Sequence, residues 1–196
     1  MEPSVRDQIV QSAYEVLSEV GPARLRVHEV AKRSGVSPTL LYYYFDGKNA
    51  LIAAAYAASY RMLVEQDAAL IEAAFSSSSS ASEMIAKMSE TFESSFSSER
   101  RKKRLAVLSA AQTDSLIADE IRPASRNLFL SLRGVLEKCQ ELGWIRENVN
   151  LDAQALLWIS LPLGFVYQDL DDSIESGFAD MLGAIFNFEV EPALNV

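Results

Sequence analysis

The sequence predicts an all-α protein: an N-terminal three-helix helix-turn-helix domain, joined by a long helix to a C-terminal helical bundle. Apolar residues recur at spacings of three and four along almost the whole chain, which is the period of a helix. Eight glycines and six prolines among 196 residues are too few for the many turns of a β-rich protein. A hydrophobic content of 49% is enough to bury a substantial core.

The first helix is expected to begin at Ser4. Asp7 follows three residues later, which is the spacing of a capping box at a helix N-terminus. Gly21 and Pro22 are expected to end this helix, because neither residue continues one easily. Its buried stripe should consist of Ile9, Ala13, Val16, Leu17 and Val20.

Residues 27–45 predict two short helices joined by a tight turn. Gly35 stands where a helix needs a left-handed stop residue. Ser37 and Pro38 then supply an N-cap and a first helical residue. Two helices connected in this way commonly place the second one in the major groove of DNA.

The second of these helices has distinct inner and outer faces. Leu41 and Phe45 lie four apart on the inner face, where they should pack into the small core. Three consecutive tyrosines are too many for such a core, so some of them should contact another molecule, which we take to be DNA. The outer face should carry Thr39, Leu40, Tyr43 and Tyr44.

The segment from Gly21 to Leu51 resembles the N-terminal DNA-binding domain of the TetR family of transcriptional regulators. The resemblance rests on a fixed spacing that ends in the run Tyr-x-x-Phe-x-x-Lys. The matching residues are Gly21, Val27, Val30, Ala31, Gly35, Val36, Ser37, Leu41, Tyr42, Phe45, Lys48, Ala50 and Leu51. It implies a homodimer that binds a near-palindromic DNA operator and a small-molecule effector. The corresponding division is 1–50 for DNA binding, with the helix-turn-helix at about 26–45, and 51–196 for effector binding and dimerisation.

Phosphate contacts are expected from Tyr42, Tyr44 and Lys48, together with the backbone amides that begin the helix after them. The resemblance implies that Tyr42 and Lys48 hold the DNA backbone. Tyr44 replaces the histidine that is usual in the family, and Arg26 replaces a threonine cap. The loss of that cap should lower the stability of the second helix by about 1 kcal/mol.

Base reading is expected from Pro38, Thr39, Leu40 and Tyr43, with Arg26 and His28 as further candidates. The four residues of the recognition helix offer none of the bidentate hydrogen bonding that Arg, Asn or Gln gives. Thr39 and Leu40 suit thymine methyl groups instead. We therefore expect important thymines, readout of DNA shape and a shallow salt dependence.

The net charge of −9 is unevenly distributed. Residues 1–50 hold six basic and six acidic side chains, so the whole excess of negative charge belongs to residues 51–196. The acidic part would be repelled from DNA and need not contact it. This balance predicts a modest affinity for DNA.

The rest of the chain predicts further helices. One should run from Lys48 to about Phe75, and the serine run from Ser76 to Ser80 should be a flexible connector. Asn150 is a candidate N-cap, and Pro162 should kink the apolar helix behind it. That helix is apolar on nearly every side, which predicts burial against both its own core and a partner subunit. The expected ranges are about 81–96, 99–113, 124–142, 151–168 and 174–188.

The C-terminal part supplies candidates for an effector pocket and a dimer interface. The pocket candidates are Tyr60, Met88, Phe92, Trp158 and Phe165. The interface candidates are Leu156, Ile159, Leu163, Met181 and Phe186. An ordinary helical core is the alternative for any of the aromatic residues. We expect an unidentified small-molecule effector and no cofactor.

Enzymatic motifs are missing from the sequence. It has no Gly-rich phosphate loop, no catalytic residues that we can assign, and one histidine without the partners of a metal site. The single Cys139 excludes an internal disulfide and fits a cytoplasmic location, and no stretch is long and apolar enough for a membrane span.

Some questions stay open at the level of sequence. The basic run from Arg100 to Arg104 could be a solvated helix start, or a contact for the DNA backbone or for an acidic patch. The sequence does not identify the operator, the effector, the regulated genes or the sign of regulation. The alternative function is a small-molecule-binding or adaptor protein whose helix-turn-helix no longer reads DNA.

Overall fold

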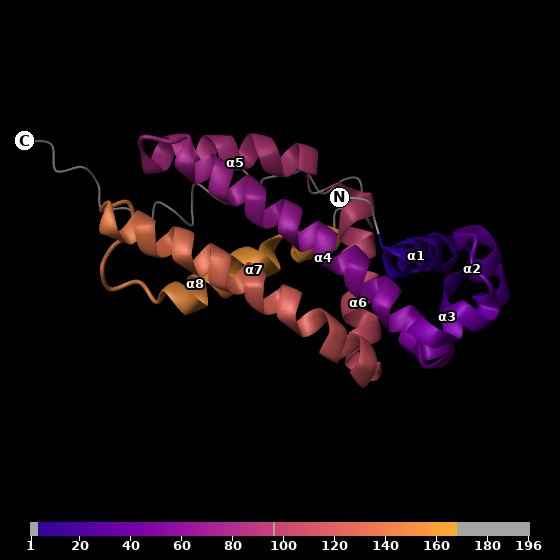
Figure 1. The fold of residues 1–196 in the computed structure, drawn as a ribbon. Coiled ribbons are helices and arrows are strands. Elements are labelled where there is room, and N and C mark those ends of the chain that lie inside the picture. Colours follow the sequence, from indigo (N-terminus) through magenta and orange to yellow (C-terminus); the bar gives the residue numbers. More distant parts are fainter. Residues whose placement is uncertain (1–3, 96, 168–196) are drawn as a thin grey trace, which may run out of the picture. The chain divides into compact units, whose positions relative to one another are not determined.

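The computed structural model describes residues 4–95 and 97–167. In these residues helices, and no strand, form the regular structure, which confirms the all-α fold class (Figure 1). The helices are α1 (Val5–Arg24), α2 (Val27–Ser34), α3 (Pro38–Tyr44), α4 (Gly47–Ser76), α5 (Ala81–Ser95), α6 (Ser98–Thr113), α7 (Ser115–Glu141) and α8 (Leu151–Gly164), followed by the 3-10 turn η1 (Phe165–Tyr167).

The chain forms two compact units. The first unit comprises Met1–Leu63 and Ala106–Ala124, and the second comprises Val64–Leu105 and Ser125–Val196. The helix-turn-helix therefore shares its unit with the end of α6 and the beginning of α7. These units are defined by contacts within the chain. The division by function into 1–50 and 51–196 stays a prediction.

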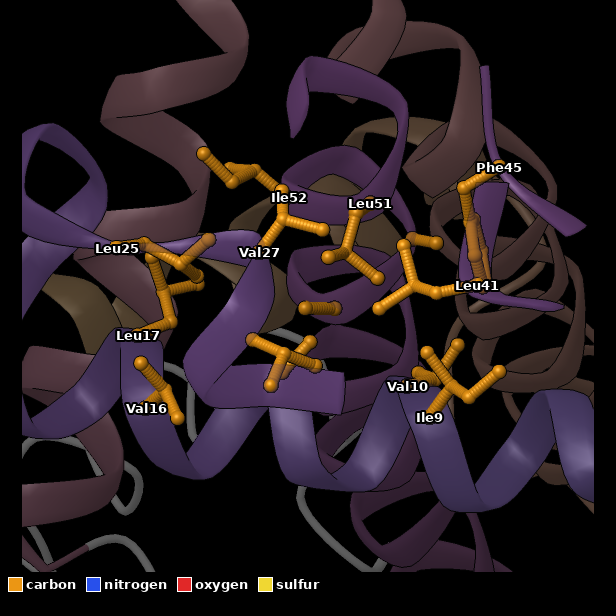
Figure 2. Packing of buried hydrophobic residues seen from close by; sticks show 14 of the residues in the cluster. Ile9, Val10, Val16, Leu17, Leu25, Val27, Leu41, Phe45, Leu51 and Ile52 are labelled. Atoms are coloured by element: carbon orange, nitrogen blue, oxygen red, sulfur yellow. The ribbon is translucent and has the colours of Figure 1, made fainter. Parts of the chain in front are cut away.

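The core of the first unit joins α1, α2, α3 and the beginning of α4. Side chains from all four helices point toward one another, and Leu41 and Phe45 lie among them on the inner face of α3, as predicted (Figure 2). The Arg6 guanidinium lies 5.2 Å from the centre of the Phe45 ring, so α1 also covers the end of α3. The buried residues are Ile9, Val10, Ala13, Val16, Leu17, Leu25, Val27, Val30, Ala31, Leu41, Phe45, Leu51, Ile52, Ala54 and Ala55.

The beginning of α1 is capped as predicted, and the helix breaks where its end was predicted. The Ser4 hydroxyl accepts a hydrogen bond from the amide of Asp7, whose carboxylate accepts one from the amide of Ser4. Gly21 adopts a left-handed φ of 75°, which kinks the helix. The first helix therefore ends at Gly21 and Pro22 as predicted, and a second short helical segment within the range of α1 continues to Arg24.

Gly35 ends α2 in the left-handed conformation, with φ 70° and ψ 20°. Replacing it by alanine is expected to lower the free energy of unfolding by about 1–2 kcal/mol, because an L residue is strained at this φ. A Cβ atom would meet nothing within 4 Å, so the loss should come from the backbone alone. Urea denaturation of the two proteins measures it.

Gly134→Ala is the matched control for this prediction. Gly134 lies inside α7, and a Cβ there also meets nothing within 4 Å. Alanine favours a helix interior, so this change should raise stability by about 0.5–1 kcal/mol. Equal effects of the two substitutions would contradict the assignment of strain to Gly35.

The serine run forms a hydrogen-bonded turn, so the prediction of a flexible connector was wrong. The Ser80 hydroxyl accepts a hydrogen bond from the amide of Glu83, and the Glu83 carboxylate accepts bonds from the amide and hydroxyl of Ser79. Lys87 donates to the Glu83 carboxylate and to the carbonyl of Ser77. These bonds, chiefly the one from Lys87, hold the pKa of Glu83 at about 2.

The helix α7 begins nine residues earlier than predicted, at Ser115 instead of 124. Pro123 lies within it and does not mark its start. Ile117 and Ile121, which are four residues apart, are both buried. Their packing holds the turns that precede the proline.

The helix α8 belongs to the core of the second unit, but it is not buried on every side. Asn150 caps it as predicted, accepting hydrogen bonds from the amides of Asp152 and Ala153. Ala155 and Trp158 are buried, whereas Leu156 is 59% exposed. Pro162 lies in its last turn, and η1 follows. The predicted helix at 174–188 lies outside the described residues.

The core of the second unit combines α5, α7, α8 and the segment between α7 and α8. Cys139 is buried in it beside Met84, with 3.7 Å between the two sulfur atoms, and burial raises the pKa of the thiol to about 11. A thiol with such a pKa stays protonated near neutral pH. The buried residues are Met84, Leu132, Val135, Leu136, Cys139, Ile145, Ala155 and Trp158.

Candidate nucleic-acid interface

The orientation of α3 is fixed from both ends. At its start, the Ser37 hydroxyl accepts a hydrogen bond from the amide of Leu40 at 3.1 Å, and Pro38 occupies the first turn. Leu41 is fully buried and Phe45 nearly so, which anchors one face of the helix in the core. The opposite face must therefore point to solvent.

Aromatic side chains dominate that solvent-facing surface. Tyr43 is 80% exposed and Tyr42 is 54% exposed, while Tyr44 and Leu40 are 37% and 38% exposed. The rings of Tyr43 and Tyr44 meet edge to face, with their centres 5.3 Å apart. Tyr43 is thus available for contact with another molecule and is not a packing residue of the core.

The remaining candidates for base reading lie on the same pair of helices. Arg26, His28 and Thr39 are exposed, and Pro38 is half-buried. Arg26 is the N-cap residue of α2 and makes no side-chain capping bond, as predicted from the missing threonine. The first amides of α2 therefore lack a side-chain cap.

Lys48 is half-buried in the first turn of α4. Its ammonium group donates a hydrogen bond to the carbonyl oxygen of Ala23, at 3.1 Å. This bond neutralises part of the negative end of α1. An ammonium group has three donors, so two remain for another acceptor.

One cation of the helix-turn-helix is held in an ion pair. The Arg33 guanidinium forms a bidentate pair with Glu19, with N–O distances of 2.6 and 3.0 Å. The hydrogen bond from Arg33 lowers the pKa of Glu19, and the same bond raises the pKa of Arg33. Arg33 therefore joins α1 to α2 through Glu19.

The effector candidates fall into different parts of the molecule. Trp158 is buried in the core of the second unit, with Met88 and Phe165 packed against that core. Tyr60 is buried too, but it belongs to the first unit. Phe92 lies in α5, and the structure does not describe its side chain. The structure thus brings three of the five predicted residues to one core.

The dimer candidates on α8 lie at or near the surface. Leu156 is exposed, and Ile159 and Leu163 are half-buried. Leu157, which the sequence did not single out, is exposed beside Leu156. Met181 and Phe186 lie outside the described residues.

The basic run from Arg100 to Arg104 begins α6, and its first and last members share one acidic partner. Asp67 accepts hydrogen bonds from Arg100 at 2.7 Å and from Arg104 at 2.8 Å. Asp67 and Arg104 are only 3% and 5% exposed. Burial raises the pKa of Asp67, while the two guanidinium groups, Arg104 first, oppose that shift. Sequence reasoning left open an acidic contact for this run, but it did not identify Asp67 as the partner.

Two further observations concern the described residues as a whole. No helix in this part of the chain is both long enough and apolar enough to cross a membrane. In the same residues, no three side chains of the types His, Cys, Asp and Glu gather where they could hold a metal ion.

Comparison with known families adds to this geometry. Residues 9–55, which contain the helix-turn-helix, match the family described as bacterial regulatory proteins, tetR family. A 55-residue segment is 38% identical to the HTH-type transcriptional regulator BetI 1 of Chromohalobacter salexigens. That match covers 28% of this chain and 27% of the relative, so this similarity is limited to about a quarter of either protein.

Solved structures resemble the chain over nearly its whole length. The reduced form of E. coli NemR superposes with a TM-score of 0.71 at 18% identity, covering 97% of this chain and all of that one. The regulator FadR of Bacillus subtilis, in complex with stearoyl-CoA, gives a TM-score of 0.63 at 18% identity and covers 92% of this chain and 95% of that one. At such identities the likeness establishes the fold alone.

Proposed function

Because residues 9–55 match the tetR family of bacterial regulatory proteins, we propose that this chain is a sequence-specific DNA-binding transcriptional regulator of that family. More narrowly, we propose a homodimeric repressor that responds to a small molecule and acts in the cytoplasm. The proposal includes a near-palindromic operator, which matches the two-fold symmetry of a dimer.

The observation that carries this proposal is the exposed tyrosine surface of α3. Leu41 fixes the inner face of the helix, and Tyr42 and Tyr43 project from it with most of their surface in solvent. Exposing large aromatic side chains in this way is unfavourable unless they bind something. Phenol hydroxyls suit phosphate oxygens, and the rings and Leu40 suit the apolar methyl groups of thymine.

The dimer is supported by the outer surface of α8. Leu156 and Leu157 are exposed on a helix whose other side is packed in the core of the second unit. Adjacent exposed leucines are typical of a surface that another chain covers. A second copy of this chain would bring two α3 helices to successive major grooves, about one helical turn apart or somewhat more.

The response to an effector is supported by the aromatic residues of the second core and by the stearoyl-CoA complex of FadR. We propose that Met88, Trp158 and Phe165 contribute to an effector pocket, with Tyr60 and Phe92 as further contributors. To release DNA, the effector must bind the DNA-incompetent form of the dimer more tightly than the competent form. The difference between these two affinities sets the largest possible response.

The experiment that tests the proposed function is selection of bound duplexes from a random DNA library by the purified protein. We expect enrichment of an inverted repeat with conserved thymines, because a dimer reads two equivalent half-sites. An enriched site without symmetry would contradict the dimer. No enrichment would favour the alternative function, a small-molecule-binding or adaptor protein.

Tyr43→Ala is expected to weaken binding to the selected operator by about 1–3 kcal/mol, as expected for the loss of a base-contacting side chain. Because Tyr43 is so exposed, its removal should leave the thermal unfolding temperature unchanged. Fluorescence anisotropy with labelled operator DNA measures the affinity.

Leu116→Ala is the control for this substitution. Leu116 is also a large exposed side chain of the first unit, but it lies on α7 and not on the helix-turn-helix. Its removal should leave operator affinity unchanged. If Tyr43→Ala and Leu116→Ala gave the same affinity, the assignment of base reading to α3 would be wrong.

A further inference from the structure

A cavity of about 410 Å³ lies within the first unit, whereas Met88, Trp158 and Phe165 of the proposed effector pocket belong to the second. Its size is at the lower end of the range for small-molecule sites. Three segments contribute to it: the end of α1, the beginning of α4, and the junction of α6 with α7. The lining residues are Pro22, Ala23, Lys48, Asn49, Ile52, Tyr56, Ala110, Thr113, Asp114 and Ile117.

The cavity combines an apolar base with a polar rim. Ile52 and Ile117 are buried, whereas Lys48 and Asp114 are half-buried and Asn49 is exposed. Such a base suits a hydrocarbon group, because the apolar surface of the ligand would be removed from water there. The rim offers hydrogen-bonding groups for the polar end of the same molecule.

Two opposite charges line this cavity without pairing with each other. In the described residues, the only hydrogen bond of the Lys48 side chain goes to the carbonyl of Ala23. Asp114 caps α7 by accepting a hydrogen bond from the amide of Leu116 at 2.9 Å, through Oδ1. Oδ2 of Asp114 and two donors of Lys48 therefore remain for a ligand.

Tyr56 adds a third polar group to the lining. Burial raises the pKa of this phenol, so the hydroxyl stays protonated and acts as a donor. Lys48, Ile52 and Tyr56 follow one another at intervals of four and share one face of α4. The cavity is thus lined by a continuous stripe of this helix.

We propose that this cavity binds a small zwitterion with an apolar side chain, such as a free apolar amino acid. The carboxylate of the ligand would accept hydrogen bonds from Lys48, and its ammonium group would donate to Asp114. The side chain would cover Ile52 and Ile117. A ligand with a single charge would leave one of the two protein charges without a partner.

Calorimetric titration of the full chain with leucine, leucinamide and N-acetylleucine tests this proposal. Leucine carries both charges, leucinamide only the positive one, and N-acetylleucine only the negative one. We expect leucine to bind about tenfold or more tightly than either derivative, because each loses one charge-assisted hydrogen-bonding partner. No DNA is present, so the result is independent of whether the protein binds an operator.

Asp114→Asn separates the ligand contact from the role of this residue in capping. Asparagine keeps an oxygen for the amide of Leu116, so α7 should remain capped. We expect the affinity for leucine to fall about tenfold, to the level of N-acetylleucine, whose affinity should not change. Asp119→Asn, on the exposed surface of α7, is the matched control and should change neither affinity.

Lys48→Met provides an independent second test with the opposite selectivity. This substitution should weaken the binding of leucine and of N-acetylleucine, because both carry a carboxylate. The binding of leucinamide, which has none, should not change. Failure of leucine, methionine and phenylalanine to give a saturable heat with the wild-type chain would overturn the proposal. The proposal would also be overturned if neither Asp114→Asn nor Lys48→Met changed the affinity for leucine.

Discussion

Replacing Asp67 by alanine is expected to lower the free energy of unfolding by about 3–5 kcal/mol, the usual cost of removing one partner from a buried ion pair. Asp67 is the shared acceptor of Arg100 and Arg104, and Arg104 is almost entirely buried. Without the carboxylate, the Arg104 guanidinium would keep its charge in a site with little water. Urea denaturation followed by far-ultraviolet circular dichroism measures the loss.

Two further variants test the physical reason for this loss. Asp67→Leu combined with Arg104→Met removes both buried charges and should recover much of the stability, since apolar replacement of a buried pair is often neutral or favourable. Asp119→Ala breaks an exposed ion pair with Arg122 and should cost at most about 1 kcal/mol. A loss below about 1 kcal/mol for Asp67→Ala would mean that Arg104 reaches solvent easily.

Leu41→Ala is expected to destabilise the first unit by about 2–5 kcal/mol and to abolish DNA binding. Leu41 is fully buried among residues of α1, α3 and α4, so its truncation would leave a cavity beneath the recognition helix (Figure 2). Native-state hydrogen exchange of the α1 and α2 amides measures the stability of this unit. Anisotropy with the selected operator measures binding.

The neighbouring Leu40→Ala is the matched control, because it makes the same chemical change one position away. Leu40 is 38% exposed, so its truncation should alter stability by less than about 0.5 kcal/mol. It should nevertheless weaken binding to sites with thymine at the contacted position. Equal destabilisation by the two substitutions would mean that the inner and outer faces of α3 have been assigned wrongly.

Features set by a few neighbouring residues could be predicted from the sequence. Ser4, Gly35, Ser37 and Asn150 each occupy the helix-end position that the sequence predicts. Caps are local, because a short side chain satisfies an amide only two or three residues away. The same applies to the two faces of α3, which follow from the spacing of Leu41 and its neighbours.

Predictions made from residue type alone failed where local hydrogen bonds or tertiary packing have the larger effect. A run of serines is typical of a linker, but the hydroxyls of Ser77, Ser78, Ser79 and Ser80 all form hydrogen bonds near a helix end. Pro123 is typical of a helix boundary, but the burial of Ile117 and Ile121 offsets the hydrogen bond that the proline removes. The serine turn and the start of α7 depend on contacts in the folded chain, which residue type alone does not reveal.

Contacts between distant segments could not be predicted at all. Arg104 and Asp67 are 37 residues apart, and nothing in the basic run identifies its acidic partner. The cavity of the first unit depends in the same way on the α6–α7 junction, where the sequence predicts no helix between residues 113 and 124. The position of Asp114 before an apolar pair, Leu116 and Ile117, is an N-cap signal that could have identified the start of α7.

The two units differ in their aromatic residues, which gives each one its own spectroscopic label. Both tryptophans of the chain, Trp144 and Trp158, are in the second unit and belong to its core or pack against it. Six of the seven tyrosines belong to the first unit. Selective excitation of tryptophan therefore follows the unfolding of the second unit directly, whereas the ultraviolet absorbance of tyrosine is weighted toward the first. If the two signals gave transitions at different temperatures, the two units would unfold independently and not in one two-state transition.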